Sequence, residues 1–343
     1  MPQTTVGIPC GLGASVLGNP AGSLRHRSGK ENLTGEPREA LLAKAILDEC
    51  NVKPYQGFIF LCGGEADANS GHPASVRDAL YRQLVKDRAL EPRIRLAEHY
   101  KDWAHDSVYS DLLIFEQHLA ELSSVIVLIL ESPGSLAELG LFVAVENFRE
   151  KLLVVIADEH YKSDSFIRLG PVDYLEKTHN NPASCYSWHG SRGEFSAQLA
   201  TSLQAELADE VRGRLHTPGG EKSFQKEEWL HKALLVAELV SIMSAITEGE
   251  IKSILNTFDL HMTSDEVRQI LYILKNTGLI DLEARGKQRF YVCADDRSYL
   301  TLRANSMILD AARFRADALE FYRKFDKKRF LAITNALSRR RSR

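Results

Sequence analysis

The sequence contains no apolar run near the ~18 residues that a membrane-spanning helix needs, so its 343 residues are not expected to cross a membrane. Its five cysteines are scattered, odd in number and free of any Cys-x-x-Cys pair. This spacing argues against a zinc site and a disulfide framework, and it favours a reducing cytoplasm. No basic segment precedes the weakly apolar residues 7–18, so we expect no signal peptide. Neither sign of charge dominates, with a net charge of -3.

What the sequence does contain is an alternation of short apolar runs and amphipathic segments. Fully apolar runs such as VIVLIL and LLVVIA are typical of parallel strands that are covered on both faces. Strands are predicted over residues 58–62, 94–97, 125–130 and 152–157, and helices over 76–90, 112–122, 136–148 and 194–215. This alternation predicts right-handed βαβ units and therefore an α/β fold.

The pattern changes on either side of this region. Residues 1–53 are predicted to form an N-terminal arm with a short helix over 37–50, and residues 54–215 the α/β domain. The stretch HTPGGEK, residues 216–222, is a predicted linker. Residues 223–343 then predict three helices, over 227–246, 248–258 and 264–276, the last capped by Thr263 or Ser264. Two strands around a basic turn at 285–287 follow, and then one long helix over 299–337. This order is typical of an α+β winged-helix domain.

Ligands of open α/β sheets bind at the carboxyl ends of the strands, and three predicted strand ends carry suitable residues. The first ends in Gly63-Gly64, which would let a ligand approach the backbone closely. The second is followed by Glu98. The third continues as Glu131-Ser132-Pro133-Gly134-Ser135, where a helix beginning at Ser135 would offer free N–H groups. The predicted substrate-binding residues are Gly63, Gly64, Glu98, Ser132, Gly134 and Ser135.

Glu138 lies near the start of this helix and has two interpretations. Ser135-x-x-Glu138 is the spacing of a capping box, in which the carboxylate would only satisfy a backbone N–H. Alternatively, Ser135 caps the helix alone while Glu138 turns into the ligand pocket as a reactive carboxylate. The sequence does not decide between these two interpretations.

The motifs ESPGSLAELG, FLCGG and RLGPVDYL together resemble the effector toxins of type II retrons over residues 55–330. Those toxins join a nucleoside deoxyribosyltransferase-like domain, with a flavodoxin-like parallel sheet, to a C-terminal winged helix. The resemblance places a catalytic nucleophile on Glu138, in Glu138-Leu139-Gly140. It places the second catalytic acid on Glu116, where the transferases have Asp.

The resemblance implies an antiphage toxin that hydrolyses an N-glycosidic bond, with NAD as substrate rather than as cofactor. Nicotinamide leaves from a cationic pyridinium and needs no proton, unlike an ordinary nucleobase. The implied partners are a retron reverse transcriptase and its multicopy single-stranded DNA joined to RNA, in a homo-oligomer or higher assembly. Two alternatives stay open, namely a nucleoside or nucleotide deoxyribosyltransferase and a non-catalytic, ligand-sensing DNA-binding regulator.

Basic residues concentrate toward the end of the chain. Between residues 323 and 343 there are nine Lys and Arg but one acid, Asp326. Phosphate backbones attract such clusters. The third helix of this region begins with Asp265 and Glu266, so reading of base edges is not expected there. The predicted nucleic-acid-binding residues are Arg285, Lys287, Arg289, Lys327, Lys328 and Arg329.

Overall fold

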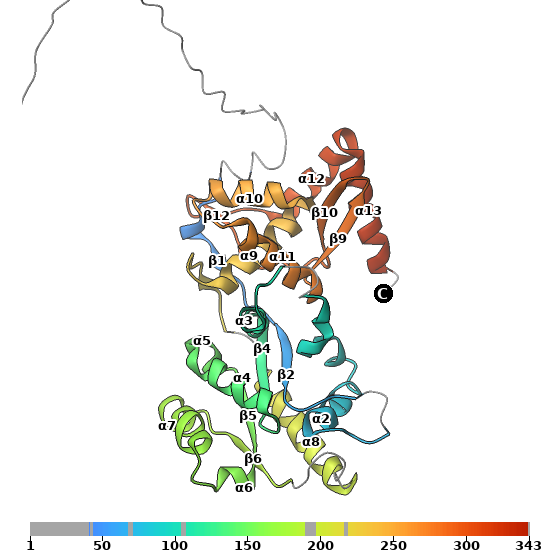
Figure 1. Ribbon diagram of the computed structural model, residues 1–343. Helices are drawn as coiled ribbons and strands as arrows, with labels where there is room; N and C mark the ends of the chain where they lie inside the picture. Colours follow the sequence, from blue (N-terminus) through green and yellow to red (C-terminus); the bar gives the residue numbers. More distant parts are fainter. Residues whose placement is uncertain are drawn as a thin grey trace, which may run out of the picture. The chain divides into compact units, whose positions relative to one another are not determined.

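The computed structural model describes residue 41 and residues 44–67, 71–103, 108–188, 197–215 and 219–341 (Figure 1). All of these belong to one compact unit, Gly35–Arg343. The predicted N-terminal arm over residues 1–35 lies outside the described residues, as does the start of the helix expected from residue 37. The described part of that helix contains a 3-10 turn, η1 (Leu47–Glu49), followed by the short strand β1 (Asn51–Val52).

A five-stranded sheet with every neighbouring pair parallel forms the core of the first half. Its order is β3-β2-β4-β5-β6, which places the second strand of the sheet before the first, as in flavodoxin-like folds. The predicted parallel α/β sheet is confirmed, and the sheet is compatible with a flavodoxin-like core. Its strands are β2 (Phe58–Cys62), β3 (Ile94–Arg95), β4 (Ser123–Ile129), β5 (Leu152–Ala157) and β6 (Ser184–Tyr186). The last of these was not predicted.

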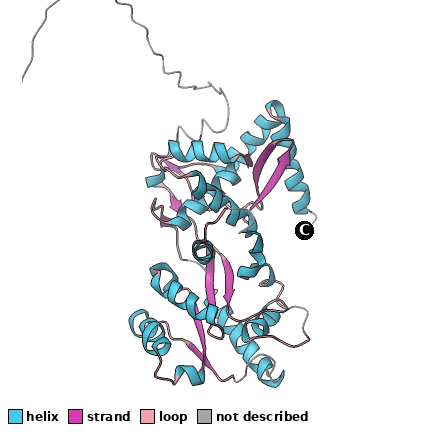
Figure 2. Ribbon diagram, viewed as in Figure 1, coloured by secondary structure: helices cyan, strands magenta, loops and turns pink. Residues whose placement is uncertain are grey.

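Helices cover the sheet (Figure 2). The central strands β2, β4 and β5 are almost wholly buried, and their alternating side chains enter two different clusters. Phe60 and Cys62 of β2 face the cluster that contains α3 and α4, whereas Ile59 and Leu61 face the cluster of α2 and α8. This is the period-two pattern of a strand. Cys62, the last residue of β2, therefore points toward the same side as α3 and α4, the helices that carry the two predicted catalytic acids.

The helices of the first half follow the predicted pattern with several differences at their ends. The covering helices are α2 (Val76–Leu84), α3 (Leu112–Leu122), α4 (Pro133–Ala144) and α8 (Ala197–Arg214). The short helices η2 (Glu91–Arg93), η3 (Ala97–Trp103), α6 (Asp158–Tyr161), η4 (Arg168–Val172) and α7 (Asp173–His179) lie in the connections.

The single helix predicted over 136–148 is wrong at its C-terminal end. It breaks at Val145, where the backbone is extended, and a short helix, α5 (Glu146–Arg149), follows. The Arg149 guanidinium donates to the carbonyl oxygens of Val143 and Ala144 (2.9 and 3.3 Å). A side chain thus satisfies two of the free carbonyls at the end of α4.

A buried lysine terminates α3 in a similar way. Lys151 Nζ donates to the carbonyl oxygens of Ala120, Glu121 and Ser123 (2.6, 3.1 and 3.3 Å). Burial lowers the pKa of Lys151 to about 8, and the Glu121 carboxylate opposes this shift. A cation at the negative end of the helix is favourable and fixes where α3 stops.

The second half begins with three helices and a three-stranded antiparallel sheet with the order β8-β10-β9. The elements are α9 (Trp229–Met243), β8 (Ala245–Ile246), α10 (Glu248–Thr257), α11 (Ser264–Asn276), β9 (Ile280–Arg285) and β10 (Gln288–Cys293). Thr263, not Ser264, caps α11 in a capping box with Glu266. The predicted turn is confirmed, because Arg285 pairs with Gln288 and Gly286 between them has φ +62°.

The continuous helix predicted over 299–337 is wrong. Its first part forms β11 (Leu300–Thr301) and the hairpin of β12 (Arg303–Ala304) with β13 (Met307–Ile308). The buried Glu238 carboxylate accepts the Tyr299 and Leu300 N–H groups (2.5 and 3.3 Å) and so holds this stretch extended. Two helices follow, α12 (Ala311–Phe325) and α13 (Lys327–Arg341), separated by Asp326.

Strand β1 ties the segment before the parallel sheet to the second half of the chain. It pairs with β11 on one side and with β7 (Lys222–Ser223) on the other. The end of the predicted linker is therefore part of a small sheet, while residues 216–218 lie outside the described part. In the described ranges, no helix combines the length and apolarity needed to span a membrane.

Arg329 holds the second half together from its interior. Its guanidinium donates to both Glu250 carboxylate oxygens (2.9 and 2.8 Å) and to the Ala245 carbonyl oxygen (2.8 Å). It also lies 5.0 Å from the centre of the Phe290 ring and 4.8 Å from that of Tyr322. These contacts join α10, β8, β10, α12 and α13.

We expect Arg329→Ala to lower the free energy of unfolding by about 3–5 kcal/mol, because it leaves the Glu250 carboxylate without its buried partner. Thermal unfolding followed by circular dichroism would measure the change. The control is Lys328→Ala, since this adjacent side chain is exposed and its removal should leave the melting temperature unchanged. Equal melting temperatures for the two variants would contradict the assignment.

Candidate active site

The glycine turn at the end of β2 brings the backbone close to the start of α2. Gly63 has φ +154°, which L side chains rarely adopt. A Cβ on Gly64 would lie 2.8 Å from Ser75 Cβ and 3.0 Å from the Glu131 carboxylate. Neither glycine can be replaced without movement of its neighbours, so the turn requires both.

Glu131, the first acid after β4, fixes this turn. Its carboxylate accepts the N–H groups of Gly64, Val76 and Arg77 at 2.9, 2.8 and 2.9 Å. Two of these donors are the first residues of α2, where a negative charge is favourable. Glu131 therefore joins the ends of β2 and β4 to the start of α2. The sequence analysis assigned it no role.

The start of α4 differs from the predicted capping box. Ser132 is the N-cap residue and forms a reciprocal capping box with Ser135, in which each hydroxyl accepts the other residue's N–H at 3.1 Å. The helix thus begins at Pro133, and Glu138 lies in its second turn. Because Ser132 and Ser135 satisfy each other, capping does not use the Glu138 carboxylate. Of the two interpretations of Glu138, the Ser135–Glu138 capping box is therefore wrong, and Ser132 rather than Ser135 is the N-cap.

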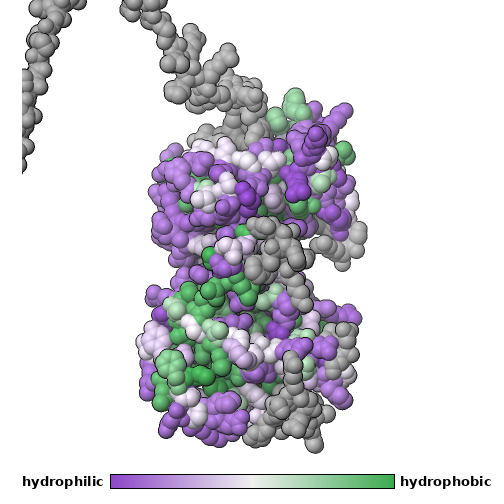
Figure 3. Space-filling view, viewed as in Figure 1, coloured by the Kyte–Doolittle hydropathy of each residue, from purple (hydrophilic) through white to green (hydrophobic). Residues whose placement is uncertain are grey.

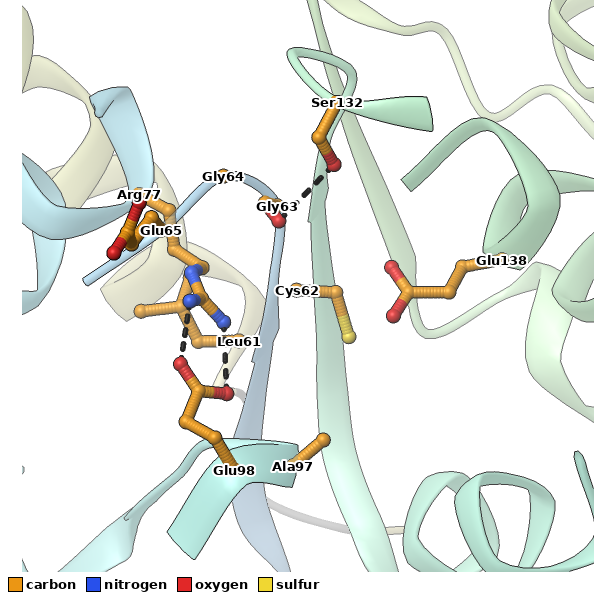
Figure 4. Close-up of a pocket in the computed structure, with 10 residues that line it drawn as sticks. All are labelled: Leu61, Cys62, Gly63, Gly64, Glu65, Arg77, Ala97, Glu98, Ser132 and Glu138. Carbon is orange, nitrogen blue, oxygen red and sulfur yellow. Dashed lines mark hydrogen bonds and ion pairs between the residues drawn. The ribbon is translucent and has the colours of Figure 1, made fainter. Parts of the chain in front are cut away.

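A cavity of about 320 Å³ lies between the ends of β2 and β4, where the strand order reverses (Figure 4). It contains five of the predicted residues, namely Gly63, Gly64, Glu98, Ser132 and Glu138. The other lining residues are Leu61, Cys62, Glu65, Arg77 and Ala97. Ser132 Oγ bridges its two sides by donating to the Gly63 carbonyl oxygen at 3.3 Å. Gly134 and Ser135 do not line the cavity.

The Glu138 carboxylate points into this cavity, and its Oε2 atom is buried without a hydrogen-bond partner among the described residues. Burial, together with the nearby Glu116 carboxylate, raises the pKa of Glu138 to about 7. Arg77 acts in the opposite direction and Glu98 in the same direction as Glu116. An unpaired carboxylate in a pocket is costly for folding, which is typical of a functional group.

Glu116 is buried in α3 and lies near Glu138, although it does not line the cavity. Burial raises the pKa of Glu116 to about 7, with a smaller contribution from Glu98. Asp111 fixes the start of α3 by accepting the Ile114 N–H at 2.9 Å. The structure therefore brings the two predicted catalytic acids close enough to influence each other's protonation, so their titrations belong to the pair.

Arg77 is a lining residue that the sequence analysis missed. Its Nη1 and Nη2 atoms pair with Glu98 Oε2 and Oε1 at 3.1 and 2.5 Å, and its Nε is buried without a partner (Figure 4). It is the one cation among the lining residues that the structure describes, against Glu65, Glu98 and Glu138. The pocket is therefore acidic and favours a neutral or cationic ligand. No grouping of three metal-ligating side chains occurs in the described ranges.

The predicted nucleic-acid-binding residues fall into two groups. Lys287, Arg289, Lys327 and Lys328 are exposed. Arg285 is partly engaged, because its Nη2 pairs with Glu283 at 3.1 Å and donates to the Leu331 carbonyl oxygen at 3.3 Å. Arg329 lies in the interior network described above, so its guanidinium is not presented to a ligand.

Comparison with known proteins relates the chain to retron effectors. A family model described as STM3845 retron effector protein matches residues 73–282. The chain is 33% identical over 150 residues to the "Retron Ec73 putative ribosyltransferase/DNA-binding protein" of Escherichia coli, covering 42% of this chain and 46% of that protein. It is 40% identical over 121 residues to the corresponding Retron Ec86 protein of Escherichia coli, covering 35% and 37%. The chain thus spans less than half the length of these two relatives.

The raised pKa of Glu138 predicts that Glu138→Gln stabilises the protein at high pH. Because the folded-state pKa of about 7 lies above the ordinary 4.5, the folded state binds more protons between these values. The free energy of unfolding therefore falls as the pH rises from 4.5 to 7, and this loss is complete above 7. We expect the variant to melt about 2–4 °C higher at about pH 8 and unchanged at about pH 4.

Glu146→Gln is the matched control, since Glu146 is exposed on α5 and its substitution should not alter the pH dependence of melting. A Glu138→Gln variant that melts lower than the wild type at about pH 8 would show that the carboxylate is stabilised in the fold, against the environment described here.

Proposed function

Because the chain belongs to the STM3845 retron effector protein family, we propose that it is a retron defence effector that hydrolyses the bond between nicotinamide and ribose in NAD. One observation carries this proposal. A carboxylate with an unpartnered oxygen, Glu138, faces a pocket at the carboxyl edge of a parallel sheet, with a second buried carboxylate, Glu116, beside it.

Two carboxylates at a sugar site suit a double displacement. Ionised Glu138 forms a bond to the anomeric carbon of the ribose while the carbon–nitrogen bond breaks. The electron pair of that bond neutralises the pyridinium, and nicotinamide leaves. A water molecule then attacks the same carbon and gives a proton to Glu116, which releases ADP-ribose and restores Glu138. Glu98, oriented by Arg77, is placed to accept hydrogen bonds from ribose hydroxyls.

The charge of the pocket supports NAD over an ordinary nucleoside. Three acids and one arginine line it, and the nicotinamide nucleoside is the cationic part of NAD. The leaving nicotinamide also needs no proton, whereas an ordinary base departs better when an acid protonates it. The histidines offer little as that acid, since none of them lines the cavity in the described part of the chain.

A nucleoside or nucleotide deoxyribosyltransferase is the second candidate. The names of both relatives include ribosyltransferase, and the same glycosyl-enzyme intermediate could pass the sugar to an incoming base. The non-catalytic regulator is the third candidate. The buried pair of Glu116 and Glu138 disfavours it, because such a pair destabilises the fold and would have no compensating use.

The proposal predicts that wild-type protein converts NAD to nicotinamide and ADP-ribose, and that Glu138→Gln lowers kcat by roughly three or more orders of magnitude through loss of the nucleophile. Glu116→Gln should lower it as well, whereas Glu146→Gln should not. Chromatography of purified reactions and of expressing cells would measure the products. Transfer of ribose to an added base, with NAD unchanged, would favour the transferase.

The pH dependence of the same reaction distinguishes a leaving group that needs no proton, such as nicotinamide, from a base that must be protonated before it leaves. For NAD, kcat/KM should rise through about 7 as Glu138 ionises and then stay level. A substrate whose base must be protonated needs one acid in its neutral form, so the profile should fall again at higher pH. A bell-shaped profile with NAD would contradict unassisted departure of nicotinamide.

We propose that residues 54–215 act as the nucleoside deoxyribosyltransferase-like domain and residues 223–343 as a winged-helix domain that binds the retron nucleic acid. In this proposal the reverse transcriptase and the multicopy single-stranded DNA hold the effector inactive. The support is the order of α9, α10, α11 and the β9–β10 hairpin, the exposed basic residues, and the words DNA-binding protein in the relatives' names.

The outer face of α4 supports the proposal of a homo-oligomer or higher assembly. Its exposed residues include Leu136, Ala137, Gly140 and Ala144, and apolar residues gather over this helix in Figure 3. Exposed apolar patches of this kind commonly mark protein contacts. The face belongs to the helix that carries Glu138, so assembly would bring another chain near the pocket.

The nucleic-acid part of the proposal predicts a change in salt dependence. Replacing Lys287, Arg289, Lys327 and Lys328 by Gln should weaken binding to single-stranded DNA and lower the slope of log affinity against log salt by roughly 0.7 per lost phosphate contact. Fluorescence anisotropy at several salt concentrations would measure both quantities. The control replaces four basic residues of the first half by Gln, namely Lys86, Arg88, Lys162 and Lys177, and should keep the slope. Equal slopes in both variants would place the binding surface elsewhere.

A further inference from the structure

Helices α12 and α13 follow one another near the end of the chain (Figure 1), and the residue at the end of α12 presents an aromatic ring to solvent. Phe325 is the last residue of α12, and 73% of its surface is exposed. The Phe321 ring supports it from one turn earlier, with the two ring centres 5.0 Å apart and the planes tilted by 42°. The Phe325 ring is therefore held in place although it is exposed. An apolar ring that stays in contact with water contributes little to the stability of the fold.

Basic residues outnumber acidic ones around this ring. Lys327 and Lys328 are exposed and form no ion pair with another described residue, whereas the exposed Arg323 interacts with the Glu320 carboxylate. Lys324 pairs with Glu320 at 2.6 Å. Asp326, the one acid of this basic stretch, accepts the Arg329 N–H at 3.0 Å and pairs with its Nε at 3.3 Å. Asp326 is thus bound to a buried partner, and the two cations that follow it, Lys327 and Lys328, stay available beside the ring.

The β9–β10 hairpin lies beside the start of α13. The Arg285 guanidinium donates to the Leu331 carbonyl oxygen, one turn after Lys327 and Lys328. The hairpin cations Lys287 and Arg289 therefore belong to the same neighbourhood as the junction of α12 and α13. A phosphate backbone could follow these cations while a base meets the ring.

We propose that Phe325 is a stacking platform for an unpaired base of a single-stranded nucleic acid, a role that rests on the nucleic-acid part of the proposed function. Aromatic side chains set among cations bind single strands in this way, because every base offers a flat face. A duplex keeps its bases stacked inside, so an isolated ring at a helix corner gains nothing from them. The surrounding cations favour phosphates over an apolar protein surface.

The test uses the full-length chain with Glu138→Gln, so that toxicity does not limit expression. Binding to a labelled oligothymidylate of about 16 nucleotides and to a duplex of equal length is measured by anisotropy. Phe325→Ala should weaken binding of the single strand by roughly 5- to 100-fold and leave both the salt slope and the duplex affinity unchanged. Phe325→Trp should keep the affinity and show fluorescence quenching on binding beyond that of the parent.

Phe325→Leu separates stacking from simple apolar contact, because it keeps apolar bulk but loses the ring. It should bind the single strand as weakly as Phe325→Ala, and full affinity in the Leu variant would overturn the proposal. Met307→Ala, which removes an exposed apolar side chain from β13, is the control and should bind as the parent does. If the parent binds and Phe325→Ala matches it, the stacking site is wrong while the nucleic-acid role stands. If the parent binds neither probe, both are wrong.

Discussion

The candidate site depends on the three hydrogen bonds that the Glu131 carboxylate accepts. They hold the end of β2, the end of β4 and the first turn of α2 in one arrangement. From this arrangement Arg77 reaches Glu98, and Ser132 reaches across to Gly63. Removal of the carboxylate would leave the first N–H groups of α2 unsatisfied and free the glycine turn. The two acids that follow β4 thus have different places, since Glu131 fixes the walls of the pocket and Glu138 lines it.

The pocket is built at a cost in stability. Burial raises the pKa of both Glu116 and Glu138, and the Glu116 carboxylate further disfavours ionisation of Glu138. Arg77 offsets part of this repulsion, but its charge is shared with Glu98. A single well-paired carboxylate would be more stable and less reactive. The arrangement leaves Glu138 near its ionisation midpoint at neutral pH, where a carboxylate can act as a nucleophile once a cationic ligand enters and favours its charged form.

The sequence predicted those parts of the structure that depend on local patterns. Helix α3, strand β5 and helix α11 have the predicted bounds, because each has a clear period and a definite start or stop. The strand ends with Gly63-Gly64, Glu98 and Ser132 do meet in one cavity, as a parallel sheet requires. The predictions that were wrong share one cause, which is that they depend on particular side-chain contacts. The break at Val145 and the extended stretch from Tyr299 depend on Arg149 and Glu238, whose partners no local pattern identifies.

The same limit explains the misjudged charges. A basic run predicts an exposed basic face, and Lys327 and Lys328 follow that rule. Arg329 departs from it because Glu250, far away in the sequence, supplies both oxygens of a bidentate pair. Arg77 was missed because its partner, Glu98, lies in a different connection of the chain, so the sequence around Arg77 does not show the pair. Position on a helix face does not reveal such pairs, whereas the folded chain does.

The helix that carries Glu116 also joins the two halves of the chain. His118 of α3 stacks on Trp229 at the start of α9, with ring centres 4.1 Å apart. Tyr109, before α3, donates to the Gln269 carbonyl oxygen of α11. Both halves contribute to one hydrophobic cluster, and the family match over residues 73–282 crosses from one to the other. A truncation between them would expose the far side of α3 and disturb Glu116. The proposed catalytic and nucleic-acid roles are therefore best separated by point substitutions in the intact chain.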